Sequence, residues 1–188
     1  MAKKIAIAPK GYRTATQVLI VSNAQAALEF YKTVFSATVN SIAYAPNGTT
    51  VLQADMKIGN SIIRVGDEMP EFGIVSPATL GGSPSPVHLY VEAVDDIWQK
   101  AIDASATVAV PLADAYWGER YGRFVDPFGH VWSVAQRQEN LSPAELAARA
   151  DAAFAPVATD AFHQADETAP VEGAAYLEPI GNDATVAA

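Results

Sequence analysis

Three side chains that could take part in chemistry alternate along one short apolar segment. His88, Tyr90 and Glu92 stand two residues apart within Val87–Glu92. If the segment is a strand, all three share one face, because successive side chains of a strand point to opposite sides. On a face that lines a cavity, His88 could serve as a hydrogen-bonding partner or a general base. The same spacing also fits a core histidine satisfied by a neighbour, and a Glu92 that lies in solvent at the strand end.

An arginine in a second apolar segment could add a charged contact. Arg64 follows a Gly-Asn turn within a run of apolar residues. A guanidinium on an inward face could bind an anionic or carbonyl-bearing ligand. The alternative is an ion pair with a carboxylate such as Asp55 or Glu92, and both readings predict a polar floor to the cavity.

Aromatic residues gather just before another predicted strand. Tyr116, Trp117 and Tyr121 surround Gly118. Their ring faces could stack on a planar ligand, as aromatic side chains in small-molecule pockets do. The alternative is ordinary packing of a loop.

Several other kinds of chemistry have no support in the sequence. The chain contains no cysteine, which excludes disulfides, thiolate nucleophiles and cysteine-based zinc sites. The pair Gly81-Gly82 has no following Lys-Ser or Lys-Thr, so it is not a phosphate loop. Neither Ser105 nor Ser133 has the glycine context of a nucleophilic serine.

An internal repeat indicates how these residues are positioned. Ser-Ala-Thr-Val occurs twice, at Ser36–Val39 and at Ser105–Val108. Each copy follows a β-rich stretch and then a segment with helical spacing of apolar residues. The predicted strand and helix are Thr14–Ser22 and Asn23–Phe35 in the first half, and Val87–Glu92 and Asp95–Ala104 in the second. Asn23 and Asp95 are the predicted N-caps.

Strand patterns follow each predicted helix. The Pro46-Asn47-Gly48 sequence is typical of a hairpin turn, and Asp126-Pro127-Phe128-Gly129 predicts a second turn. The predicted strands are Thr38–Tyr44, Thr50–Ile58 and Ser61–Val65, then Thr107–Leu112, Tyr121–Val125 and His130–Ala135. Each half therefore reads βαβββ, and the fold class is α+β.

The predicted organisation is one domain with an appendage. We expect a domain over 1–136, with modules at about 12–68 and 86–136 and a proline-rich linker at 69–85. The segment 137–154 should be helical, because Ser142, Pro143 and Glu145 have the order of a helix start. The acidic, Ala/Pro-rich tail 155–188 is expected to be disordered.

Charge and hydropathy limit the classes of partner. Residues 1–136 hold 10 Lys and Arg against 12 Asp and Glu, whereas 137–188 hold 2 against 9. The acidity therefore belongs to the tail, and no basic stripe suggests nucleic acid as a partner. No apolar run approaches the roughly 20 residues of a membrane helix, and the N-terminal apolar stretch is too short for a signal peptide. We expect a cytoplasmic protein.

Five segments together resemble a known family. They are Leu28–Lys32, Ser76–Pro84, Val87–Val91, Tyr116–Gly122 and Asp126–Trp132. They are similar to the glyoxalase/bleomycin resistance protein/dioxygenase group, or vicinal oxygen chelate superfamily, and most of all to its PhnB-like branch. The resemblance spans about residues 12–150. It implies paired βαβββ modules, curved sheets around a cavity, and a homodimer.

Enzymes of that superfamily place four metal ligands on the inward faces of the first and last strands of each module. By motif, those positions are Thr16, Arg64, His88 and Ser133. Only His88 is a good ligand type, and a guanidinium repels a cation. We therefore expect no metal and no cofactor.

The resemblance and these departures from it favour a metal-independent protein that binds and sequesters a small aromatic or polar molecule. The expected ligand-binding residues are Thr16, Arg64, His88, Tyr90, Glu92, Trp117, Tyr121 and Ser133. A metal-dependent lyase, isomerase or dioxygenase of the glyoxalase type is the alternative, with His88 and Glu92 or Glu119 as ligands or acid and base. A third possibility is an interaction protein that uses its acidic tail.

Overall fold

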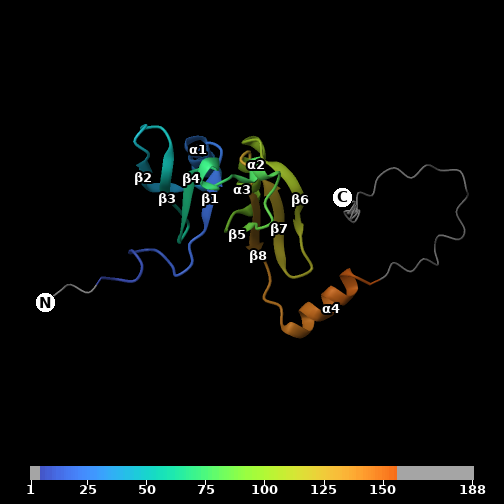
Figure 1. The fold of residues 1–188 in the computed structure, drawn as a ribbon. Coiled ribbons are helices and arrows are strands. Elements are labelled where there is room, and N and C mark those ends of the chain that lie inside the picture. Colours follow the sequence, from blue (N-terminus) through green and yellow to red (C-terminus); the bar gives the residue numbers. More distant parts are fainter. Residues whose placement is uncertain (1–4, 156–188) are drawn as a thin grey trace, which may run out of the picture. The chain divides into compact units, whose positions relative to one another are not determined.

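The computed structural model describes residues 5–155, and those up to Ala153 belong to one compact unit. The tail, with its predicted disorder and its acidic partner surface, lies outside the described residues apart from Ala155. No helix in the described range is long and apolar enough to cross a membrane. Figure 1 shows the elements in order: β1 (Val18–Val21), α1 (Ala24–Phe35), β2 (Thr38–Tyr44), β3 (Val51–Ile58), β4 (Ser61–Asp67), η1 (Pro70–Phe72), α2 (Pro77–Leu80), β5 (Val87–Tyr90), α3 (Val94–Asp103), β6 (Thr107–Asp114), β7 (Glu119–Val125), β8 (Val131–Arg137) and α4 (Pro143–Ala153).

The two halves have the same topology, which confirms the predicted pair of βαβββ modules. The first sheet has the strand order β1-β4-β3-β2 and the second has β5-β8-β7-β6. In each sheet the strand before the helix pairs in parallel with the last strand, and the other pairs are antiparallel. A parallel pair needs a long crossover, which the helix and the intervening hairpin provide.

Two strands are shorter than the sequence predicted. β1 begins at Val18 instead of Thr14, so Thr16 precedes the strand. The parallel ladder with β4 starts where Val18 faces Arg64, and before it the chain leaves the sheet as an N-terminal arm. Likewise β5 ends at Tyr90, and Glu92 lies in an exposed bend that leads into α3.

The predicted helix caps are confirmed at two helices and wrong at one. The Asn23 side chain accepts a hydrogen bond from the Ala26 amide at 3.0 Å. Ser142 and Glu145 exchange the reciprocal bonds of a capping box before α4. Asp95, however, does not cap α3, because the helix begins at Val94 and the Asp95 carboxylate instead pairs with Arg120 at 2.6 Å.

A single aromatic cluster joins the two halves. Phe35 of α1 packs against Trp132 of β8 with ring centroids 4.6 Å apart, and Tyr31 packs against the same indole at 5.2 Å. Trp132, Tyr31 and Phe124 are fully buried. The helix of the first module therefore fills the core of the second, and the halves share one hydrophobic interior.

The buried carboxylate of Asp126 satisfies four donors at this junction. Its Oδ2 accepts the Tyr31 hydroxyl and the Trp132 indole N–H, both at 2.8 Å. Its Oδ1 accepts the backbone amides of Phe128 and His130, both at 2.9 Å. The side chain is only 4% exposed, so these bonds replace the water that an ionised carboxylate would otherwise require.

The linker between the modules is ordered and packs on the same turn. Ser76 is fully buried and caps α2, and its amide donates to Glu68 at 2.9 Å. Gly129 has φ +87, and a Cβ there would lie 2.9 Å from the Ala78 amide nitrogen. Only glycine allows both this backbone conformation and this close approach of α2.

Replacing Tyr31 with phenylalanine should lower the free energy of unfolding by about 1–3 kcal/mol, because Asp126 would lose one donor without gaining water. Urea denaturation at pH 7 measures the loss. Tyr44→Phe is the matched control, since Tyr44 is 43% exposed on β2, and it should change stability by less than about 0.5 kcal/mol. Equal effects of the two variants would contradict the role assigned to the buried hydroxyl.

The contribution of Tyr31 should also depend on pH. Burial, and then the neighbouring Asp126 charge and hydrogen bond, raise the pKa of Tyr31 well above its ordinary value. The folded protein therefore keeps this proton at a pH where the unfolded chain loses it. The stability advantage of the wild type over Tyr31→Phe should be full below pH of about 10 and shrink as pH rises further. An advantage that stays constant or grows between pH 9 and pH 11 (bounds chosen around the tyrosine pKa of about 10) would rule this out.

Candidate functional site

The second sheet has one face against the helices and one open face. Trp132 and Val134 of β8 are buried in the core, and Val87 and Leu89 of β5 pack against it. Because side chains alternate along a strand, Ser133, His88 and Tyr90 point to the opposite side. We call this side of β5–β8 the open face.

The strand register brings four of the predicted residues together there. His88 pairs with Ser133 across β5 and β8, and Tyr90 pairs with Ala135. Tyr121 of β7 pairs with the same Ala135 from the other side. The His88 Nδ1 and the Ser133 hydroxyl are hydrogen bonded at 2.9 Å, and Ser133 is 2% exposed. His88 is therefore held in a fixed orientation on a strand, as a binding group should be.

Four rings form a continuous row across the open face, which we call the aromatic row. The His88 ring lies 4.7 Å from that of Tyr90 and is stacked on Tyr121 at 6.2 Å with an interplanar angle of 20°. Trp117 closes the row, at 5.3 Å from Tyr121. All four residues were predicted from the sequence to contact ligand.

Carboxylate and guanidinium groups border the aromatic row. Glu119 accepts the Trp117 indole N–H at 2.8 Å, and its hydrogen bond with Tyr90 raises the pKa of the Tyr90 phenol. Arg123 donates to the Tyr121 hydroxyl at 3.1 Å. Its Nε is buried and has no hydrogen-bond partner among residues 5–155.

The sequence analysis considered Glu119 only for the enzyme alternative, as a metal ligand or as an acid or base, and did not single out Arg123. The signal for Arg123 was present, because residues 121 and 123 of one strand share a face. Its position beside the site depends on the pairing of Arg123 with Ser133. That register could not be read from the sequence.

A hollow of about 450 Å³ adjoins the aromatic row. It is bounded by Tyr90 and Trp117 of the row, by charged side chains, and by two leucines, one before α4 and one within it. The residues that line it are Tyr90, Trp117, Glu119, Arg137, Glu139, Leu141 and Leu146. The site thus combines ring faces, apolar walls and a few charges, which is the usual make-up of a small-molecule pocket.

Arg64 has a separate setting on the first sheet. Its Nε pairs with Asp55 at 3.2 Å, and its guanidinium carbon lies 5.3 Å from the ring centre of Tyr12. Burial alone would raise the pKa of Asp55, but hydrogen bonds from Tyr12, Ser41 and Arg64 hold that pKa below its ordinary value. The ion pair that sequence analysis gave as the alternative for Arg64 is therefore present. Thr16 and Glu92, outside their strands, do not join the His88 group.

The donor set does not fit a divalent metal ion. Of the four positions at which the superfamily's metal enzymes carry ligands, one is a histidine, one an arginine and two are hydroxyl residues. His88 is bonded to Ser133, and the neighbour of Ser133 on β7 is the cationic Arg123. Across residues 5–155 no three His, Asp or Glu side chains gather as metal ligands would.

Several known proteins are similar to this chain in sequence or in fold. An uncharacterised protein of Mycobacterium tuberculosis is 35% identical over 133 residues, which cover 69% of this chain and 78% of that protein. The crystal structure of TioX from Micromonospora sp. ML1 is 27% identical, with a TM-score of 0.51 over 65% of this chain and 98% of TioX. A PhnB protein from Bacillus cereus shares the fold, with a TM-score of 0.54 at 17% identity over 66% of this chain and 99% of that one.

The family model of the Glyoxalase/Bleomycin resistance protein/Dioxygenase superfamily matches residues 13–134, from the arm before β1 to β8. That range includes both modules and the open face. It also contains all five segments whose sequences resemble this superfamily. The chain belongs to the glyoxalase/bleomycin resistance protein/dioxygenase superfamily.

Proposed function

We propose that this chain binds a small aromatic or polar molecule without a metal ion and sequesters it on the open face of the second sheet. The observation that carries this proposal is the aromatic row beside the 450 Å³ hollow. The ligand-binding groups would be His88, Tyr90, Trp117 and Tyr121, with Ser133 orienting the imidazole.

The physical basis is burial of a ring plus a few directed hydrogen bonds. A planar ligand that loses about 200 Å² of apolar surface gains about 5 kcal/mol. Two or three hydrogen bonds add about 1 kcal/mol each, and the loss of the ligand's translational and rotational freedom offsets a large part of this gain. Arg123 favours a ligand with an acceptor group, because its buried Nε has no partner among the described residues.

We propose that a second copy of the chain completes the site in a homodimer, in the cytoplasm. Exposed apolar side chains support this: Tyr90 is 68% exposed on the open face, and Val110 of β6 is 39% exposed. Val18 of β1 is 51% exposed on the first sheet. A second chain over these residues would remove them from water and enclose the ligand.

The purified protein should take up far less than one metal ion per chain after incubation with Ni, Zn, Mn or Fe(II) followed by dialysis. The reason is the donor set, because no three His, Asp or Glu side chains gather as metal ligands in the part of the chain that the structure describes. Elemental analysis measures the content, and His88→Ala should give the same result as the wild type. Near-stoichiometric metal that disappears in His88→Ala would instead support the glyoxalase-type lyase, isomerase or dioxygenase.

A panel of planar aromatic and antibiotic-like compounds should include some that raise the melting temperature of the full chain. For such a compound, Tyr121→Leu should weaken binding about tenfold, because it removes one of the two inner rings of the row and the partner of Arg123. Titration calorimetry gives the affinity.

Tyr44→Leu is the control for this titration, since it removes an exposed tyrosine from β2 on the first sheet. It should leave the affinity within about twofold of wild type. If no compound binds, or if the two variants bind equally well, the aromatic row is not the binding site.

A further inference from the structure

The N-terminal arm, residues 5–17, is fastened to the first sheet by Tyr12. The Tyr12 ring lies over the Arg64 guanidinium at 5.3 Å, and its hydroxyl hydrogen bonds to Asp55, which raises the pKa of the Tyr12 phenol. Gly11 has φ +91 and lies close to the strand, since a Cβ there would be 3.3 Å from Cδ1 of Ile62. These contacts hold Gly11 and Tyr12 against β3 and β4.

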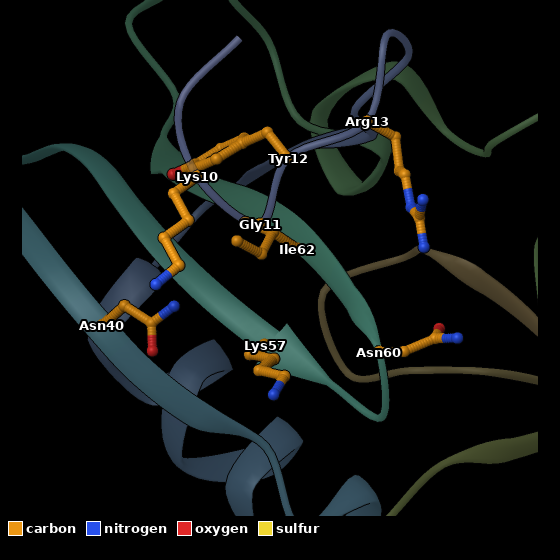
Figure 2. Close-up of a pocket in the computed structure, with 8 residues that line it drawn as sticks. All are labelled: Lys10, Gly11, Tyr12, Arg13, Asn40, Lys57, Asn60 and Ile62. Carbon is orange, nitrogen blue, oxygen red and sulfur yellow. The ribbon is translucent and has the colours of Figure 1, made fainter.

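The arm and the sheet border a hollow of about 650 Å³. Figure 2 shows Lys10 extending from the arm toward Asn40 of β2. The cationic residues come from two different elements, the arm and β3. The residues that line the hollow are Lys10, Gly11, Tyr12, Arg13, Asn40, Lys57, Asn60 and Ile62.

The charges around this hollow are all positive. Lys10, Arg13 and Lys57 contribute three cations, and no aspartate or glutamate lines the hollow. Within residues 5–155, none of the three forms a salt bridge. These cations give the hollow a local positive charge, although residues 1–136 as a whole hold 10 Lys and Arg against 12 Asp and Glu.

The carboxylate nearest in sequence on the same strand does not neutralise Lys57. Asp55 lies two residues before Lys57 on β3, and it is already engaged by Arg64 at 3.2 Å and by Ser41 at 3.0 Å. The cation–carboxylate pairing on the first sheet is thus complete without the three cations of the hollow. They remain available to an external anion.

We propose that this hollow is a binding site for the oxyanion of a small molecule, a phosphoryl or carboxylate group. Lys10 and Asn40 supply donors on one side of the hollow, Arg13 and Asn60 supply donors on the opposite side, and Lys57 adds an ammonium group from β3. Charge-assisted hydrogen bonds of this kind are the strong ones for such groups. The site does not involve the aromatic row, so it stands whether or not the proposed function of the open face holds.

The test is an NMR titration of the full chain with pyrophosphate and, separately, with citrate, each at constant ionic strength set with sodium chloride. Saturable shifts confined to the amides around residues 10–13, 57 and 60 are expected for at least one of the two anions. Tighter binding of pyrophosphate identifies a phosphoryl ligand, and tighter binding of citrate identifies a carboxylate ligand.

Lys57→Gln should weaken the binding about tenfold, because it removes one charged donor from the hollow. Lys100→Gln on α3 is the control with the same change in net charge, outside the hollow, and it should bind as the wild type does. Absence of saturable shifts with both anions overturns the proposal. Equal weakening of binding by Lys57→Gln and Lys100→Gln would also overturn it, because the anions would then respond to the overall charge of the protein and not to a defined site.

Discussion

The structure of the described domain depends on one buried carboxylate. Asp126 lies in the turn between β7 and β8, yet it binds the hydroxyl of Tyr31 on the helix of the other module. The same group accepts the Trp132 indole and two amides of its own turn. A buried charge is tolerated only when its hydrogen bonds are complete. The turn, α1 and β8 must therefore all be in place together.

This arrangement leaves the other faces of the two sheets free for function. The aromatic core occupies the helix side of the second sheet, so the aromatic row on the open face lies outside it. The superfamily's metal enzymes carry ligands on such faces, whereas here two of those positions, Arg64 and His88, are engaged by other side chains. Arg64 is bound to Asp55, and His88 to Ser133. The same scaffold can therefore carry different residues at these positions.

Much of the fold could be predicted because its signals are local. The repeated strand–helix order, the Asn23 cap and the Ser142–Glu145 box all depend on residues within a few positions of one another. The sequence-based predictions were wrong where contacts between residues distant in sequence determine the local structure. Asp95 has the chemistry of a cap but is drawn to Arg120, 25 residues away in sequence.

The site was predictable only in part, for the same reason. His88 and Tyr90 share a strand, so their common face could be inferred, whereas Arg123 joins them through the pairing of β7 with β8. Lys10 and Lys57 are 47 residues apart, and only the path of the arm over β4 brings them to one hollow. Strand alternation gives the face of a residue but not its neighbours on other strands.

The bond from Tyr31 to Asp126 also has a consequence for biosynthesis. It joins residues 95 positions apart, and the bond from His130 to the Ile20 carbonyl spans 110. During synthesis, α1 leaves the ribosome long before the strands that cover its aromatic face. Contacts of such sequence separation slow folding, because a long loop must close before they form. Tyr31 and Phe35 therefore cannot pack against Trp132 until β8 has been synthesised.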